Sequence, residues 1–160
     1  MKITFLGTGT SQGIPMIAND DPVCLSNDSK DKRLRSSVMI SWDDTCYVID
    51  CGPDFRQQML RENIQAINGV LFTHEHSDHT AGIDDLRPFT YKMGEVPIYA
   101  QERVIESLKV RFSYIFETEN RYAGAPKLTE NIIDSSSFTL SGVNITPIVV
   151  MHGELPIMGY

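Results

Sequence analysis

The sequence predicts a mixed α/β fold, in which helices pack on a sheet, and three observations support this. Val104, Ile105 and Leu108 share one face of a helical pattern at residues 101–111. With 160 residues and a hydrophobic content of 41%, the chain can form one domain, residues 1–160, around an ordinary core. Apolar runs of strand length occur on both sides of that helix, at residues 2–6, 37–41, 46–49, 64–72, 96–100, 127–134, 137–140 and 143–150.

The first expected strand, residues 2–6, alternates apolar and polar side chains and places Ile3 and Phe5 on one face. Gly7 and Gly9 then end this strand. Two glycines permit a tight turn or a close approach to a ligand. Because neither the P-loop nor the dinucleotide-binding pattern is present, we predict a tight turn near a pocket rather than a phosphate-binding loop.

A long polar segment, residues 11–32, follows and shows neither a helical nor a strand period. Its Cys24 is expected to pack as a small apolar side chain. The basic residues of the segment 30–35 have two interpretations. They form a solvated surface turn, or they attract an anionic substrate.

Residues 37–41 and 46–49 are predicted to form a hairpin, because the polar residues between them favour a turn. The segment 52–54 then starts a helix. Its proline suits the first helical position, and its aspartate complements the positive end of the helix dipole. Phe55 and Met59 lie four residues apart and would share the buried face of that helix.

The composition argues against several classes of protein. A net charge of −7 does not indicate the basic face that nucleic-acid binding needs. No apolar run approaches the roughly 18 residues of a membrane span, and the first residues lack the layout of a signal peptide. Cys24, Cys46 and Cys51 lack C-x-x-C spacing, which suits reduced thiols. We therefore expect a cytoplasmic protein.

Three of the four histidines lie in one short run, directly after an apolar strand. Imidazole nitrogens and carboxylate oxygens are ligands for zinc, manganese or iron. Alternate residues of an extended segment point the same way, so His74 and His76 can face one ion while Glu75 points elsewhere. Asp78 and His79 come after the chain turns and can reach a second ion. The alternative is a solvated polar loop.

A short helix is expected after this run, and residues 84–88 would close it. Asp84 and Asp85 belong to this segment. They could be read as further metal ligands, but the surface preference of aspartate favours exposed or supporting acids.

The motif H-x-H-x-D-H at residues 74–79 resembles that of the metallo-β-lactamase superfamily. The segments 5–15, 35–37 and 50–56 narrow the resemblance to one branch. This branch contains the cyclic phosphodiesterase of bacterial phosphonate breakdown and, more distantly, the transfer-RNA 3′-processing nucleases. The resemblance covers nearly the whole chain and implies an αβ/βα sandwich that is C-terminally incomplete.

Further site residues follow from the resemblance alone. It implies that His152, after a late apolar strand, joins His74 and His76 at one ion, and that Asp50 accepts the ring N–H of a ligating histidine. It also implies two divalent ions, Zn or Mn, in the complete enzyme. The family has a bridging aspartate and a final histidine downstream, and neither occurs before Tyr160. We therefore expect a chain truncated at its C-terminal end that holds one ion or none and has weakened or absent activity.

The predicted function is hydrolysis of a small cyclic or nucleotide-like phosphodiester by a metal-bound hydroxide. Asp78 would serve as a ligand and as the proton acceptor for the water. The expected partner is that small phosphodiester, without a membrane or a nucleic acid, and a homodimer is left open. Two alternatives remain. A transfer-RNA nuclease would need a basic arm, whereas the missing ligands favour a non-catalytic metal-binding domain.

Overall fold

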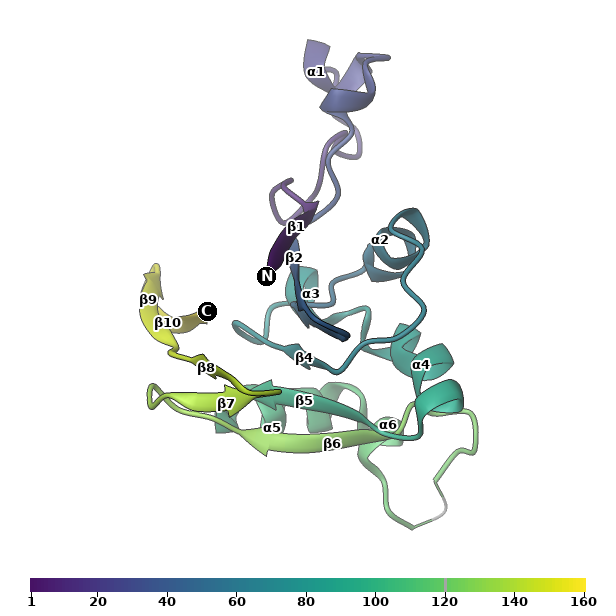
Figure 1. Cartoon of the computed structure of the whole chain (residues 1–160). Coiled ribbons are helices and arrows are strands. Elements are labelled where there is room, and N and C mark those ends of the chain that lie inside the picture. The colour runs from purple at the N-terminus through teal and green to yellow at the C-terminus, as the bar shows by residue number, and fades with distance from the viewer. Residues whose placement is uncertain (120) are drawn as a thin grey trace.

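The structure is a computed structural model that describes residues 1–119 and 121–160 (Figure 1). At its centre is a six-stranded sheet in the order β1-β2-β3-β4-β5-β6. The pairs β1–β2 and β2–β3 are antiparallel, whereas β3 to β6 run parallel. The strands are β1 (Lys2–Gly7), β2 (Ser37–Trp42), β3 (Thr45–Ile49), β4 (Gly69–Leu71), β5 (Val96–Ala100) and β6 (Leu128–Ile132).

Helices connect the parallel strands, and two small antiparallel pairs follow the sheet. None of the described helices is both long and apolar enough to cross a bilayer. The pairs are β7 (Phe138–Leu140) with β8 (Val143–Ile145), and β9 (Ile148–His152) with β10 (Leu155–Gly159). The helices are α1 (Pro22–Leu25), η1 (Ser29–Asp31), α2 (Phe55–Arg61), α3 (Ser77–Thr80), η2 (Ile83–Leu86), α4 (Arg87–Met93), α5 (Glu102–Arg111) and α6 (Ser113–Phe116).

One face of the sheet forms the larger hydrophobic core with the helices. Val70 and Ile98, opposite each other on β4 and β5, are fully buried there. Phe55 of α2, Phe89 of α4 and Leu108 of α5 belong to the same cluster. Burial of apolar surface drives this packing, so the helices are held on the face that alternate strand residues supply.

The other face of the sheet carries a smaller aromatic core. Tyr47 and Leu71 point to this side, where Leu140 of β7 packs on them. The rings of Tyr99 and Phe138 stack with their centroids 5.9 Å apart. Figure 1 shows β7 and β8 beside the parallel part of the sheet. The sheet is therefore covered by helices on one side and by a hairpin on the other.

Most elements lie where the sequence predicts them. The hairpin β2–β3, strand β5 and helix α5 are confirmed. Phe55 and Met59 are both buried on α2, and Cys24 is buried in α1. Ile3 and Phe5 do share a face of β1, but it is the exposed one, because Leu6 on the opposite face enters the core.

Several predicted boundaries were wrong, and helix α2 begins at Phe55, after the proline expected at its first position. Within residues 64–72 only Gly69–Leu71 is strand. The run 143–150 is divided into β8 and β9, and Pro147 lies between them, where it has no N–H to give to a ladder. Pro88 does not close a helix; it occupies the first turn of α4, where its missing N–H costs nothing.

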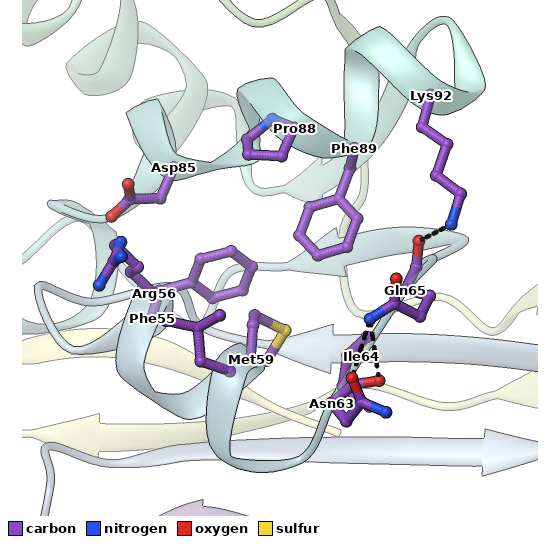
Figure 2. Close-up of a pocket in the computed structure, with 11 residues that line it drawn as sticks. Phe55, Arg56, Met59, Asn63, Ile64, Gln65, Asp85, Pro88, Phe89 and Lys92 are labelled. Atoms are coloured by element: carbon purple, nitrogen blue, oxygen red, sulfur yellow. Dashed lines mark hydrogen bonds between the residues drawn. The ribbon is translucent and has the colours of Figure 1, made fainter.

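A pocket of about 390 Å³ lies between α2 and α4 (Figure 2). Phe55 and Met59 of α2 face Phe89 of α4 across it, and Arg56 and Lys92 lie at its two ends. Histidines are absent from its lining, so this pocket is separate from the histidine cluster described next.

Candidate metal centre

The loop that leaves β4 places His74 and His76 side by side. His74 is buried, and its Nε2 lies 3.1 Å from Nδ1 of His76. His76 has extended backbone angles and precedes the first residue of α3. The hydroxyl of Thr80 donates to the carbonyl of His76 at 2.9 Å and so ties α3 to this loop. The predicted extended spacing of the two histidines is therefore present.

His152 reaches the same place from the β9–β10 hairpin. Its ring centroid lies 5.4 Å from that of His74 and 5.3 Å from that of His76. Ligand atoms of the three residues all lie within 4.8 Å of one another. His152 is the last residue of β9 rather than a residue beyond the strand. The structure thus brings together the three side chains that the sequence analysis assigned to one ion.

Asp78 and His79, on α3, lie next to this cluster. Nε2 of His79 is 3.2 Å from Oδ2 of Asp78. The ring centroids of His79 and His74 are 4.1 Å apart. The carboxylate and the imidazole expected at a second ion are therefore neighbours, on the side of His74 that faces α3.

Asp50 contacts Thr73 and His79 next to the cluster. Its carboxylate accepts hydrogen bonds from the backbone N–H of Thr73 at 2.8 Å and from the Thr73 hydroxyl at 2.9 Å. Nδ1 of His79 lies 2.6 Å from the same carboxylate. Asp50 is buried and has a φ of 62°, a left-handed conformation that aspartate tolerates better than most residues.

These hydrogen bonds determine which ring nitrogens are free. The one proton of the Thr73 hydroxyl goes to Asp50, so this hydroxyl accepts the Nδ1–H of His74 at 2.9 Å. We likewise assign a proton to Nδ1 of His79, which faces Asp50. Nε2 of His74 and Nε2 of His79 are then left with lone pairs directed toward the cluster.

Burial and neighbouring charges shift two of these imidazoles in opposite directions. Burial, together with the nearby His79, His76 and His152, lowers the pKa of His74 to about 4. Burial also opposes the protonation of His79, but its hydrogen bond to Asp50 and the charges of Asp50 and Asp78 outweigh this and raise its pKa. At neutral pH His74 is therefore the neutral imidazole that metals bind.

The cluster opens into a pocket of about 400 Å³. Ser11 and Ser36 are lining residues that the sequence analysis did not identify as part of the site. Ser36 donates to the carbonyl of Gly9 at 2.9 Å, and Nε of Arg35 donates to the carbonyl of Ser11 at 2.9 Å. The lining residues are Ser11, Ser36, His74, His76, Asp78, His79, His152 and Ile157.

Ser11 and Ser36 belong to the segments 5–15 and 35–37, which carry the family resemblance. The resemblance could therefore have indicated that they lie at the site. The backbones of the two segments approach closely: a Cβ on Gly7 would lie 1.9 Å from the carbonyl oxygen of Arg35. Gly7 is therefore required for the close contact of two segments, and the tight turn predicted at Gly7 and Gly9 was wrong, because Gly7 pairs with Ser37 and Gly9 with Arg35. Arg35 binds Asp54 at 2.9 Å, which engages one cation of the basic segment in the scaffold.

The donor set fits a divalent metal ion. Three imidazoles converge with ligand atoms within 4.8 Å, and their type suits zinc or manganese. Two pairs of potential acceptors also lie within hydrogen-bond distance, His74 with His76 at 3.1 Å and His79 with Asp78 at 3.2 Å. Such pairs repel unless a proton or a cation lies between them. Asp84 stands apart from this set and pairs with Arg87.

Comparison with known proteins identifies the family. Residues 45–160 match the β-lactamase superfamily domain. The chain belongs to the metallo-β-lactamase superfamily. Members of this superfamily are typically metal-dependent hydrolases. The resemblance that the motifs predicted is thereby confirmed, and so is the α/β metallo-β-lactamase fold.

Solved structures give the same fold. A crystal structure of a new diphosphatase from the PhnP family superposes with a TM-score of 0.89 and 40% identity, over 99% of this chain and 60% of that one. Zn²⁺-bound PqqB from Methylobacterium extorquens has a TM-score of 0.73 at 22% identity, over 94% of this chain and 56% of its own. The second similarity shows the fold alone.

Related sequences are considerably longer than this chain. An octanoyltransferase of Porphyromonas gingivalis is 42% identical over 163 residues, which span 100% of this chain and 32% of that protein. A ribonuclease Z of Methanococcus maripaludis (strain C5) is 26% identical over 147 residues, 86% of this chain and 42% of its own. This chain thus spans about a third to three fifths of the length of these relatives.

Proposed function

We propose that the protein is a metal-dependent hydrolase that cleaves a P–O bond of a small phosphate compound, first of all a cyclic or nucleotide-like phosphodiester. The observation that carries this proposal is the convergence of His74, His76 and His152 beside the pair His79 and Asp78. All five side chains line one pocket of about 400 Å³, which is large enough for a small ligand.

Each residue has a distinct task in this proposal. His74, His76 and His152 would hold one divalent ion, Zn or Mn, and His79 and Asp78 would contribute to a second ion in the complete enzyme. Such ions lower the pKa of water and stabilise negative charge on phosphoryl oxygens. The carboxylate of Asp78 accepts the proton of the attacking water, and Asp50 keeps the proton of His79 on Nδ1.

The similarity to the PhnP-family diphosphatase supports phosphate chemistry, at 40% identity over 99% of this chain. Because that protein is a diphosphatase, a diphosphate is the second candidate substrate, and its phosphoanhydride is also cleaved at a P–O bond. The ribonuclease Z relatives keep a transfer-RNA nuclease as an alternative at lower identity, and the net charge of −7 does not favour it.

An activity and metal-binding assay on the purified chain tests the proposal. With Zn²⁺ or Mn²⁺ added, we expect hydrolysis of bis(p-nitrophenyl) phosphate or a 2′,3′-cyclic nucleotide, and at least tenfold less for His152→Ala, on the order of losses in disturbed metal sites. Lys92→Ala alters only the pocket between α2 and α4 and serves as the control, with unchanged activity.

Activity on other substrates, and metal binding without activity, distinguish the alternatives. Cleavage of diphosphates alone would move the assignment to the second candidate. Cleavage of thioesters alone would reject phosphate chemistry. Metal binding without any hydrolysis would overturn the enzyme proposal in favour of a non-catalytic metal-binding domain.

A further inference from the structure

Two arginines of α5, Arg103 and Arg111, contact the loop that carries His74 and His76, and neither lines the pocket of the candidate metal centre. Arg111, the last residue of α5, donates to the Thr80 hydroxyl at 3.0 Å, to the Ser77 hydroxyl at 3.0 Å and to the carbonyl of Glu75. Arg103, in the first turn, donates to the Glu75 carboxylate. Glu75 therefore does point away from the histidines on either side of it, as the extended spacing predicts.

Arg103 also makes a second contact that Arg111 lacks. Its Nη1 binds the Glu75 carboxylate, while its Nη2 donates to the carbonyl of Pro156 on β10 and to the side chain of Gln101. One planar guanidinium thus joins the loop that carries His74 to the hairpin that carries His152. The fork of an arginine can satisfy both acceptors at once, whereas a lysine ammonium is a single point of charge.

The other attachments of the hairpin lie on β10 and beyond it, where the Met158 side chain is buried. On β10, Leu155 and Pro156 are paired with His152 and Met151 of β9. Every residue of β9 is exposed, so apolar burial does little to hold His152 in place. Farther along β10, the N–H of Met158 donates to the carbonyl of Thr73 at 3.0 Å. Beyond the strand, the Tyr160 hydroxyl donates to the carbonyl of Phe72 at 2.9 Å.

We propose that Arg103, acting with Glu75, is a positioning residue that sets the place of His152 relative to His74 and His76. This inference rests on the proposed metal site. An exposed ion pair alone contributes little to stability, and the two side chains are 33% and 26% exposed. The contact to Pro156 gives the pair a geometric role, because it connects two segments whose side chains must converge on one ion.

Arg103 and Arg111 make different contacts, so a substitution of Arg103 can be tested while Arg111 stays in place. In Arg103→Met, Arg111 still holds the loop at Glu75, Ser77 and Thr80. The Glu75 carboxylate loses its partner, and the hairpin loses its bond at Pro156 but keeps those of Met158 and Tyr160. Lys109→Met is the matched control, since it breaks the ion pairs of another α5 cation with Glu130 at 2.9 Å and Glu106 at 3.3 Å.

Zinc affinity, measured by competition with a chromophoric chelator, is the main readout. We expect Arg103→Met to bind zinc on the order of tenfold more weakly, the scale found for groups that orient metal ligands. Arg103→Lys keeps the charge but not the fork and should remain weaker than wild type. Lys109→Met should bind as wild type does.

A second readout needs no metal. In the metal-free protein, amide hydrogen exchange of Met158 should accelerate in Arg103→Met, and ring-proton contacts between His152 and His76 should weaken in NMR spectra. A purely structural role would lower the melting temperature without this local change. If Arg103→Met does not fold, Glu75→Gln and Arg103→Lys carry the same comparison.

The two proposals fail in different ways. Absence of zinc binding by the wild-type chain would reject the metal site itself. Wild-type binding that persists unchanged in Arg103→Met, or in Arg103→Lys to the full wild-type level, would reject the positioning role and leave the metal site intact.

Discussion

At the scale of a single residue, the backbone conformation of Asp50 determines where its carboxylate lies in the candidate metal centre. Strand β3 ends at Ile49, and Asp50 then turns into a left-handed conformation with φ 62°. This turn directs its carboxylate at Thr73 and His79, which it contacts within 2.9 Å. Strained backbone at a functional site persists where surrounding contacts stabilise it, and three hydrogen-bond donors do so here.

Substitution of Asp50 separates its two roles. Asparagine tolerates the left-handed backbone but presents an amide where His79 needs an acceptor, so Asp50→Asn should weaken zinc binding by about 10- to 100-fold. Asp50→Ala should in addition destabilise the fold by about 1–3 kcal/mol, because buried donors lose their acceptor. Chelator competition and thermal denaturation measure the two effects. Unchanged zinc affinity in Asp50→Asn would contradict the assigned orientation of His79.

At the scale of elements, the segment after β3 and helix α3 are in direct contact through glycines. A Cβ on Gly52 would lie 1.9 Å from the carbonyl oxygen of Asp78, and one on Gly82 would lie 2.1 Å from that of Gly52. Real side chains do not approach so closely. The absence of a side chain at these positions therefore allows α3 to pack against the segment that follows β3, so that His79 reaches Asp50.

Alanine substitutions test this contact. Gly52→Ala should displace α3 and abolish tight zinc binding, with a loss of stability on the order of 3 kcal/mol from overpacking. Gly142→Ala is the control: its φ is 82° but nothing lies within 4 Å of the added Cβ. It should cost about 1–2 kcal/mol through backbone strain and leave zinc affinity unchanged. Equal effects of both variants on zinc would contradict the role of the close approach.

At the scale of the whole molecule, a bound metal would link segments that are distant along the chain. His74 and His76 follow β4 in the central sheet, whereas His152 lies on the β9–β10 hairpin. A ligand that binds only the folded chain stabilises it by mass action, about 2.7 kcal/mol at a hundredfold excess over Kd. The exposed hairpin should gain most from this link.

Calorimetry with and without zinc tests the link. At zinc concentrations about a hundredfold above Kd, the melting temperature should rise by roughly 5–10 °C, and a chelator should reverse the rise. His152→Ala should lose most of the increase while its metal-free melting temperature stays close to that of wild type, since this residue is exposed. An equal rise in wild type and His152→Ala would show that zinc binds elsewhere.

Local patterns by themselves determined much of the architecture. The alternation in β2, β3 and β5 and the helical period of α5 depend on neighbours a few residues apart, so the printed sequence displays them. The same holds for His74 and His76, whose spacing places both on one side of an extended loop. Strand lengths were less evident: β4 has only 3 residues, because Ile64 and Ile67 before it pack into the core from a loop.

Only the tertiary structure decided which distant residues meet. It placed Ser11 and Ser36 at the pocket, Asp50 against His79 rather than another histidine, and Arg103 between two segments of the site. The position of His152 was expected from the resemblance and not from any pattern in the chain. Contacts between residues far apart in sequence depend on how strands and helices pack, and no local period records that packing.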